Sequence, residues 1–317
     1  MKTRVVSLDI ARGLSVIWIV GILHVIGFVV SPESFPEWLL KMIEGLTKSC
    51  LATFTYLSGY FVAGRRMSSG KEVYKFFKKR IIRFAVLYFV ACILLYFAGI
   101  VLSNDVRWFR SINQLVATLI GVSGLIPNFQ PATFWYFSMI ILFYLFTPYI
   151  SFAKSNIQKI IRCLIVLSCL LFETVIVGAD TRLPFYFIFY ACGAFNQSLR
   201  ILNVKETLIA LIIFIPLILI QNLEYYLSVQ NLIVSILGMG LILSFSYKIS
   251  SPKLISFLSF IAYGSMCAYL YHRHLYALIK KMYKGEYWPV YIWPIAVIVV
   301  FLMGYAIQSI YDRSLKK

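Results

Sequence analysis

Ionisable side chains in the first apolar segment could do chemistry inside a membrane. In the run RVVSLDIARGLSVIWIVGILH, Asp9 and Arg12 lie near one end, and His24 follows a stretch without charged residues. A helix that begins near Leu8 would carry His24 about 24 Å along its axis, which is most of the thickness of a bilayer core. An ionisable residue at that depth is costly and by default marks a functional site. The alternative is a histidine that is hydrogen-bonded to a neighbouring helix for packing only.

The other candidate acids and bases lie later in the chain. His272 and His274 are near the outer end of another apolar segment, but residues at i and i+2 do not share a helix face, so this pair alone does not predict a metal site. All three histidines occur in two segments, which is compatible with one site between the two corresponding helices. Glu173 lies inside a third segment, where it could orient a histidine or only hydrogen-bond to a neighbouring helix.

Two arginines lie three residues apart in the basic run RRMSSGKEVYKFFKKRIIR. Arg80 and Arg83 therefore share one helix face, at the cytoplasmic start of an apolar segment. Two guanidinium groups in that position could bind phosphates bidentately, as recognition of a coenzyme or nucleotide requires. Contact with anionic lipid head groups is the alternative, and it is the favoured interpretation for the lysines between Lys71 and Lys79.

The composition shows what kind of protein must position these residues. Of the 317 residues, 61% are hydrophobic and 13% are charged, whereas a soluble domain has about 25% charged residues. An integral membrane protein in contact with lipid is therefore predicted. The net charge of +18 comes from basic residues in the short loops between apolar segments, which indicates membrane topology and no nucleic-acid partner. The six cysteines lie in apolar segments without C-x-x-C spacing, which predicts neither disulfides nor a metal site.

The apolar segments predict an all-α, polytopic membrane protein with about ten transmembrane helices. Residues 1–317 would form a single domain with no separate soluble part. Most Lys and Arg residues then fall on the side of the two termini, which the positive-inside rule places in the cytoplasm. The segment 183–197 is short for a span and 115–127 could be a re-entrant or interfacial helix, so the alternatives are about nine or eleven spans. The predicted spans are 8–30, 44–64, 81–103, 132–152, 160–178, 183–197, 205–222, 229–247, 254–279 and 290–311.

Taken together, short motifs in this chain resemble those of acyltransferase family 3, membrane proteins that acylate sugars of bacterial surface glycans. Each motif is short and apolar, so the resemblance depends on their order, which is the expected one across almost the whole chain. The matching runs are SLDIARG followed by His24, FTYLSGY, Arg80 with Arg83, FWYF with FYLFTPYI, FYFIFYACGA, and SFLSFIAYGS with AYLYHRHLY.

The resemblance implies that acyl-CoA reaches the site from the cytoplasm as a co-substrate, with acetyl as the commonest acyl group and no tightly bound cofactor. The acceptor would be a glycan or a lipid-linked sugar, and the chain would be a multi-pass protein of the inner membrane. The same resemblance makes His24 essential, assigns donor binding to Arg80 and Arg83, and adds Arg12 as a catalytic candidate. A neutral imidazole could serve as general base or as a transient acyl carrier.

One spacing departs from the family pattern. The arginine and histidine of the family's first helix usually stand 11 residues apart, on nearly the same face. Arg12 and His24 stand 12 apart, which is about 120° around a regular helix. A π-bulge between them would restore the alignment, and π-bulges occur frequently at functional sites.

A non-enzymatic transporter of a lipid-linked sugar or small anion is the rival function. About ten helices and a basic cytoplasmic face suit a transporter as well as an enzyme. Composition and spacing leave the two nearly balanced, and only the resemblance favours the enzyme. Consumption of acyl-CoA would distinguish them.

Overall fold

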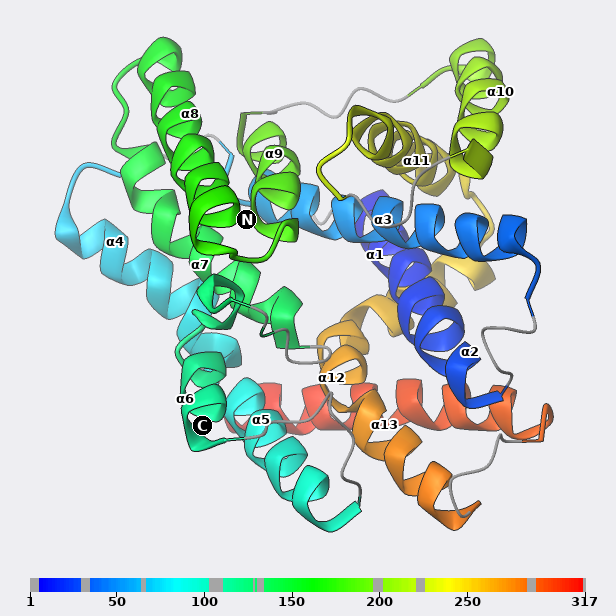
Figure 1. Ribbon diagram of the computed structural model, residues 1–317. Coiled ribbons are helices and arrows are strands. Elements are labelled where there is room, and N and C mark those ends of the chain that lie inside the picture. Colours follow the sequence, from blue (N-terminus) through cyan, green and yellow to red (C-terminus); the bar gives the residue numbers. More distant parts are fainter. Residues whose placement is uncertain are drawn as a thin grey trace. The chain divides into compact units, whose positions relative to one another are not determined.

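The computed structural model describes residues 6–29, 35–63, 67–102, 111–127, 129, 134–195, 202–220, 226–283 and 289–315. The ends of several predicted spans and the side chain of Arg83 lie outside this description. Among the described residues there are helices and turns but no strands, which confirms the all-α prediction. The α-helices in Figure 1 are α1 (Val6–Trp18), α2 (His24–Val29), α3 (Glu37–Tyr60), α4 (Gly70–Phe77), α5 (Arg83–Leu102), α6 (Ile112–Leu119), α7 (Phe134–Ser151), α8 (Asn156–Phe172), α9 (Arg182–Phe195), α10 (Val204–Ile220), α11 (Val229–Lys248), α12 (Pro252–Met282) and α13 (Ile292–Ser314). Shorter segments are the π-helices η1 (Ile19–Leu23), η3 (Lys78–Ile82) and η5 (Glu173–Val177) and the 3-10 helix η4 (Ser123–Leu125).

Among the residues that the structure describes, seven segments are long and apolar enough to cross a membrane, so the chain is a polytopic membrane protein. Each corresponds to one of the predicted spans. The other three predicted spans are also helical, in α3, α9 and α10, but α9 has 14 residues and is about 21 Å long, which is less than a bilayer core of about 30 Å. The total of about ten spans and the cytoplasmic position of the termini stay predictions. The seven segments are Val6–Ile26, Gly70–Phe97, Phe134–Ser151, Asn156–Val177, Val229–Lys248, Pro252–Met282 and Ile292–Ser314.

Serine side chains begin several of these helices. Ser111, Ser155 and Ser228 precede α6, α8 and α11, and each side-chain oxygen accepts a hydrogen bond from a backbone N–H three residues later, at 3.3, 3.2 and 3.1 Å. The first N–H groups of a helix have no intrahelical partner, so a serine at this position stabilises the helix start. These caps explain where three helices begin.

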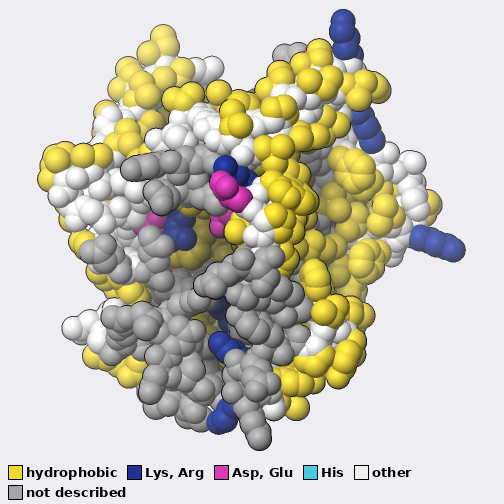
Figure 2. Space-filling model, turned by 45° about the vertical axis from the view of Figure 1, so that its right-hand side comes forward, with side chains coloured by type: hydrophobic (Ala, Val, Ile, Leu, Met, Phe, Trp, Pro, Cys, Tyr) yellow, Lys and Arg dark blue, Asp and Glu magenta, His cyan; other side chains and the backbone are white. Residues whose placement is uncertain are grey.

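Large apolar side chains cover the outer faces of several helices. Ile157 in α8 and Ile212 in α10 are each 71% exposed. Figure 2 shows broad hydrophobic areas on one face of the molecule, with Lys and Arg side chains at scattered points. Contiguous apolar surface of this kind is unusual on a soluble monomer and is expected where helices meet lipid.

Residues 115–127 do not form a span. The eight-residue helix α6 is followed by a turn at Gly121 and by η4. Gly121 has a φ angle of 79°, and a Cβ there would lie 2.6 Å from Cγ2 of Ile141 in α7. Only glycine adopts this left-handed turn without strain while the loop packs against α7. The segment therefore fits the predicted re-entrant or interfacial element.

The chain divides into two compact units, which are described separately. The first comprises residues 1–54 and 198–317, and the second comprises residues 55–197. In the first unit α1 packs against α12 and α11, and α12 packs against α13 (Figure 1). In the second unit α5 packs against α6, and α8 packs against both α7 and α9.

Glycines allow very close helix crossings in the first unit. A Cβ on Gly13 of α1 would lie 2.6 Å from the carbonyl oxygen of Leu258 in α12. A Cβ on Gly264 of α12 would lie 2.6 Å from the backbone nitrogen of Tyr305 in α13. Small residues at crossings are the main means by which helices associate in lipid, because van der Waals contact replaces the hydrophobic effect there.

The second unit uses the same device between α3 and α9. A Cβ on Gly59 would collide with the carbonyl oxygen of Tyr190, and a Cβ on Gly193 would collide with that of Tyr56. The two glycines come from the FTYLSGY and FYFIFYACGA runs. Packing therefore accounts for the glycines of both motifs.

The crossing of α12 with α13 can be tested by adding one methyl group. Gly264→Ala places that group against backbone atoms, so it is expected to lower the free energy of unfolding by about 1–3 kcal/mol. Gly240→Ala in α11 is the matched control, because its Cβ would lie 3.5 Å from the Leu202 side chain, an ordinary contact. Thermal unfolding of both variants in detergent measures the difference, and equal melting temperatures would contradict the close crossing.

Candidate active site

The π-bulge required by the 12-residue spacing of Arg12 and His24 is present. The segment η1 covers Ile19–Leu23, between α1 and α2. The backbone N–H of His24 donates to the carbonyl oxygen of Ile19, five residues earlier, which is the π-helical bond. His24 is therefore the first residue after the bulge.

The bulge brings His24 against a second histidine. The imidazole rings of His24 and His272 are stacked, with centroids 4.7 Å apart and planes inclined by 5°. His272 belongs to α12 and is fully buried. The rings of Tyr269 and Tyr276 lie 5.8 and 5.4 Å from that of His272. The structure thus places one histidine of the first predicted span beside one histidine of the ninth.

The hydrogen bond of His272 determines its tautomer. Its Nδ1 lies 2.8 Å from the carbonyl oxygen of Tyr269. A carbonyl can only accept, so Nδ1 carries the proton and, in the neutral ring, Nε2 carries the lone pair. Nε2 of His272 and Nδ1 of His24 are buried and have no hydrogen-bond partner among the described residues. Buried polar atoms without partners are rare, so both nitrogens are candidates to contact a substrate.

Arg12 faces the same helix as His24. Its Nη2 donates to Oγ of Ser265 in α12 at 3.4 Å. Ser265 and His272 are seven residues apart, which is two helical turns, so they lie on one face of α12. The backbones of Arg12 and His24 are nevertheless about 18 Å apart along the helix axis, and their partners on α12 are about 10 Å apart, too far for both side chains to contact the same reacting atoms. Asp9 lies in the first turn of α1, where a carboxylate stabilises the helix dipole.

His274 lies on another face of α12. Its ring is 5.6 Å from that of Tyr271, at an angle of 42°. The i and i+2 histidines therefore point to different surroundings, as expected. In the part of the chain that the structure describes, no three His, Cys, Asp or Glu side chains gather as metal ligands.

Arg80 lies in the second unit, within the π-helix η3. Its Nη2 donates to the carbonyl oxygen of Phe61 at 2.9 Å, and its Cζ lies 5.8 Å from the centre of the Phe61 ring. Its Nε is buried without a hydrogen-bond partner among the described residues. Arg83 is the first residue of α5. Nη2 of Arg80 therefore holds the guanidinium on Phe61, and Nε remains a donor without a partner among the described residues.

Two more cations of the second unit bind helix ends in the same way as Arg80. Arg162 donates to the carbonyl oxygen of Tyr149 at 2.5 Å and lies 5.0 Å from that ring. Lys159 donates to the carbonyl oxygen of Ala194 at 2.7 Å. Cations stabilise the last carbonyls of a helix and its dipole. Sequence patterns indicated only the topological role of these charges, because a capping partner is a tertiary contact.

Glu173 also lies in the second unit, at the start of η5. Its backbone oxygen accepts a hydrogen bond from the N–H of Ala179 at 3.1 Å, and its side chain is half-exposed. Its predicted role as a partner of a histidine stays a prediction.

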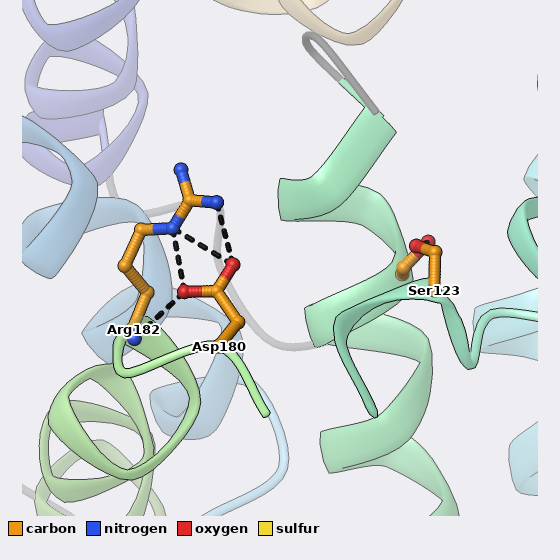
Figure 3. Close-up of polar contacts among 4 residues, drawn as sticks. Ser123, Asp180 and Arg182 are labelled. Atoms are coloured by element: carbon orange, nitrogen blue, oxygen red, sulfur yellow. Dashed lines mark hydrogen bonds and ion pairs between the residues drawn. The ribbon is translucent and has the colours of Figure 1, made fainter. Parts of the chain in front are cut away.

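A buried ion pair in the second unit was not indicated by the sequence. Nε of Arg182 lies 2.8 and 2.9 Å from the two carboxylate oxygens of Asp180 (Figure 3), and its Cζ is 3.8 Å from the centre of the Trp135 ring. The Ser123 side chain in the same view donates to Oγ of Ser138 at 2.8 Å. The only sequence signal was an Asp-x-Arg spacing in a loop. The two opposite charges neutralise each other within the protein, which favours a structural role for the pair.

A second buried cation, Lys48 of α3, lies in the first unit. Its Nζ donates to Oδ1 of Asn231 in α11 at 3.2 Å and lies 5.0 Å from the centre of the Tyr226 ring. A buried lysine must be paired or hydrogen-bonded, because burial of an unpaired charge is costly. These contacts join α3 to α11.

A comparison with protein families gives a match over most of the chain. The model of acyltransferase family 3, described as an acyltransferase domain, matches residues 5–309, which is nearly the whole chain. No curated protein and no solved structure matches this chain.

The structural role of the buried ion pair can be tested by removing its carboxylate. Asp180→Asn leaves the guanidinium of Arg182 buried without its counter-ion, so the free energy of unfolding is expected to fall by about 3–5 kcal/mol. Glu37→Gln breaks the ion pair with Lys41, in which the Glu37 side chain is 78% exposed, and serves as the control with almost no change. Thermal unfolding of the two variants checks this, and equal losses would contradict it.

Proposed function

The chain belongs to acyltransferase family 3 and is a membrane acyltransferase, and we propose that it moves an acyl group from cytoplasmic acyl-CoA to a hydroxyl of a bacterial surface glycan. Acetyl is the proposed acyl group. The stacked pair of His24 and His272 carries the proposal, because it supplies two buried imidazole nitrogens without partners among the described residues. We place this multi-pass protein in the inner membrane. The proposed acceptor is a glycan or a lipid-linked sugar.

The proposed reaction needs a base within reach of the acceptor hydroxyl. As the hydroxyl oxygen bonds to the thioester carbonyl carbon, an imidazole nitrogen of the pair accepts the hydroxyl proton. The carbon–sulfur bond then breaks, and the coenzyme thiolate takes that proton from the imidazolium. In the alternative route, His24 takes the acyl group first and passes it to the hydroxyl.

Stacking limits the pair to one positive charge. Two imidazolium rings with centroids 4.7 Å apart would repel each other in an apolar environment, where charge is poorly screened. His272 keeps its Nδ1 proton on the Tyr269 carbonyl, so its Nε2 is the site that gains and loses a proton. The pair therefore works as a single base.

The arginines are proposed to bind the donor. Nε of Arg80 is a buried donor without a partner among the described residues, and guanidinium groups bind phosphates strongly. Arg83, three residues on, completes the R-x-x-R pattern of the family. Arg12 is too far along the helix to stabilise charge at the carbon that reacts beside His24, so we assign it to a more distant part of the coenzyme.

The base can be tested by two substitutions in purified protein in nanodiscs with acetyl-CoA and a panel of hexose acceptors. His24→Ala is expected to reduce release of the free coenzyme thiol by about 10²–10⁴-fold. His272→Asn keeps a donor for the Tyr269 carbonyl but removes Nε2, and the same loss is expected. Quenched wild-type protein carrying an acyl group on His24, detected by mass spectrometry, would select the transient-carrier route.

Several outcomes would contradict these assignments. Full turnover by folded His24→Ala would remove its catalytic role, and full turnover by His272→Asn would leave His272 with packing only. If folded wild-type protein consumes no acyl-CoA with any acceptor, the proposed enzyme activity fails and transport becomes the better hypothesis.

Donor binding can be tested with two arginines that have similar structural contacts. Arg80→Lys is expected to raise the KM for acetyl-CoA roughly ten-fold, because a lysine has no Nε and cannot bind phosphate bidentately. Arg162→Lys removes the same kind of helix-end contact and is expected to leave this KM unchanged. Equal effects in the two variants would mean that Arg80 only holds a helix end.

A further inference from the structure

The π-helix η1 leaves a backbone oxygen that needs a hydrogen-bond donor from outside its own helix. Within η1 the bonds run five residues back, as His24 N–H to Ile19 O shows. Where such a segment returns to a regular helix, the bonds run four residues back, and one carbonyl oxygen loses its intrahelical donor. Buried backbone groups in a membrane must be paired, because no water is there to replace the lost bond.

Two side chains from other helices donate to adjacent backbone oxygens of η1. The hydroxyl of Tyr276 in α12 donates to the carbonyl oxygen of Val20 at 3.0 Å. The indole Nε1 of Trp293 in α13 donates to the carbonyl oxygen of Gly21 at 2.6 Å. An indole N–H can only donate and a carbonyl can only accept, so the direction of this bond is fixed. Tyr276 is fully buried, so bulk water does not compete with the Val20 oxygen for its hydroxyl.

Gly21 lets α13 approach η1 closely enough for these bonds. A Cβ on Gly21 would lie 3.2 Å from Cγ1 of Val297 and 3.9 Å from a ring carbon of Phe301. Trp293, Val297 and Phe301 follow one another at intervals of four residues, so one face of α13 covers the bulge.

The bulge determines which way His24 faces. Before η1, Arg12 contacts Ser265, and after η1, His24 stacks on His272, so both face α12. A regular helix over the same 12 residues would place them about 120° apart and turn one of them away. The stacked pair therefore depends on the π conformation being kept.

We propose that Tyr276 and Trp293 are positioning residues that hold η1 in the π conformation and thereby keep His24 stacked on His272. The proposal deepens the function proposed above and rests on it for its kinetic consequence. The ring of Tyr276 also packs against His272, with centroids 5.4 Å apart, so the test must keep that ring and remove only its hydroxyl. Each acts on His24 through the backbone oxygens of Val20 and Gly21.

The kinetic test removes each donor and keeps an aromatic ring at each position. Tyr276→Phe and Trp293→Phe are expected to lower kcat for acetyl-CoA consumption by about 10–100-fold, because small displacements of a catalytic group have effects of this size. The KM for acetyl-CoA should stay the same. Tyr263→Phe is the matched control: it removes a tyrosine hydroxyl of α12 that binds Asp312, and kcat should not change.

A deletion separates positioning from simple stability. Deleting Ile22 gives Arg12 and His24 the 11-residue spacing that suits a regular helix, so η1 and its two outside donors are no longer needed. In this background, Tyr276→Phe and Trp293→Phe should have almost no further effect on kcat. A loss of kcat that the deletion fails to reduce would overturn the proposal.

Cross-linking tests the geometry without any acyl transfer. Copper-phenanthroline should form a disulfide in the double variant His24→Cys and His272→Cys, at a rate that falls about ten-fold when Tyr276→Phe is added and recovers when Ile22 is deleted. An unchanged rate in both Tyr276→Phe and Trp293→Phe backgrounds would overturn the positioning role. If wild-type protein shows no turnover, the proposed function fails, and this rate alone decides the inference.

Discussion

The close contact of α1 with α12 is the constraint on which the candidate site depends. At one end Gly13 brings the two backbones together, because any larger residue would meet the Leu258 carbonyl. Further along the chain, His24 meets His272 on the same partner helix. In lipid, helices are held by van der Waals contact and hydrogen bonds, so a close crossing fixes the rotation of each helix. That rotation decides which polar side chains meet inside the unit.

Polar groups inside this protein fall into two chemical classes. Some cations are paired with backbone oxygens and aromatic rings, as Lys159 and Arg162 are at helix ends. Others keep a buried donor or acceptor without a partner among the described residues, as His24, His272 and Arg80 do. Burial of such an atom without a hydrogen bond is costly in an apolar interior. It is therefore expected where a bound ligand supplies the missing hydrogen bond. Ser15 and Ser235 also have such an atom, but the sequence did not make them candidates, as it did these two histidines and Arg80.

Each of three candidate residues lies in or beside a π-helical segment. His24 follows η1, Arg80 lies within η3, and Glu173 begins η5. A π segment rotates the following helix relative to a regular one and changes the direction of its side chains. It also leaves a backbone oxygen that needs a hydrogen-bond donor from another helix. Side chains of neighbouring helices can therefore stabilise the segment. Local backbone irregularity and placement of functional groups are thus linked.

By itself the sequence determined the all-helical membrane class, the family and the residues able to do acid–base chemistry. It also determined that Arg12 and His24 need a π-bulge to share a face, because residue spacing sets rotation along a single helix. It did not determine that His272 rather than His274 meets His24, nor that Asp180 pairs with Arg182 in a buried site. Those choices depend on how helices distant in sequence rotate and pack against each other, which no local pattern encodes. Only the tertiary structure decided them, because it fixes the rotation of α12 that brings one of its histidines to His24.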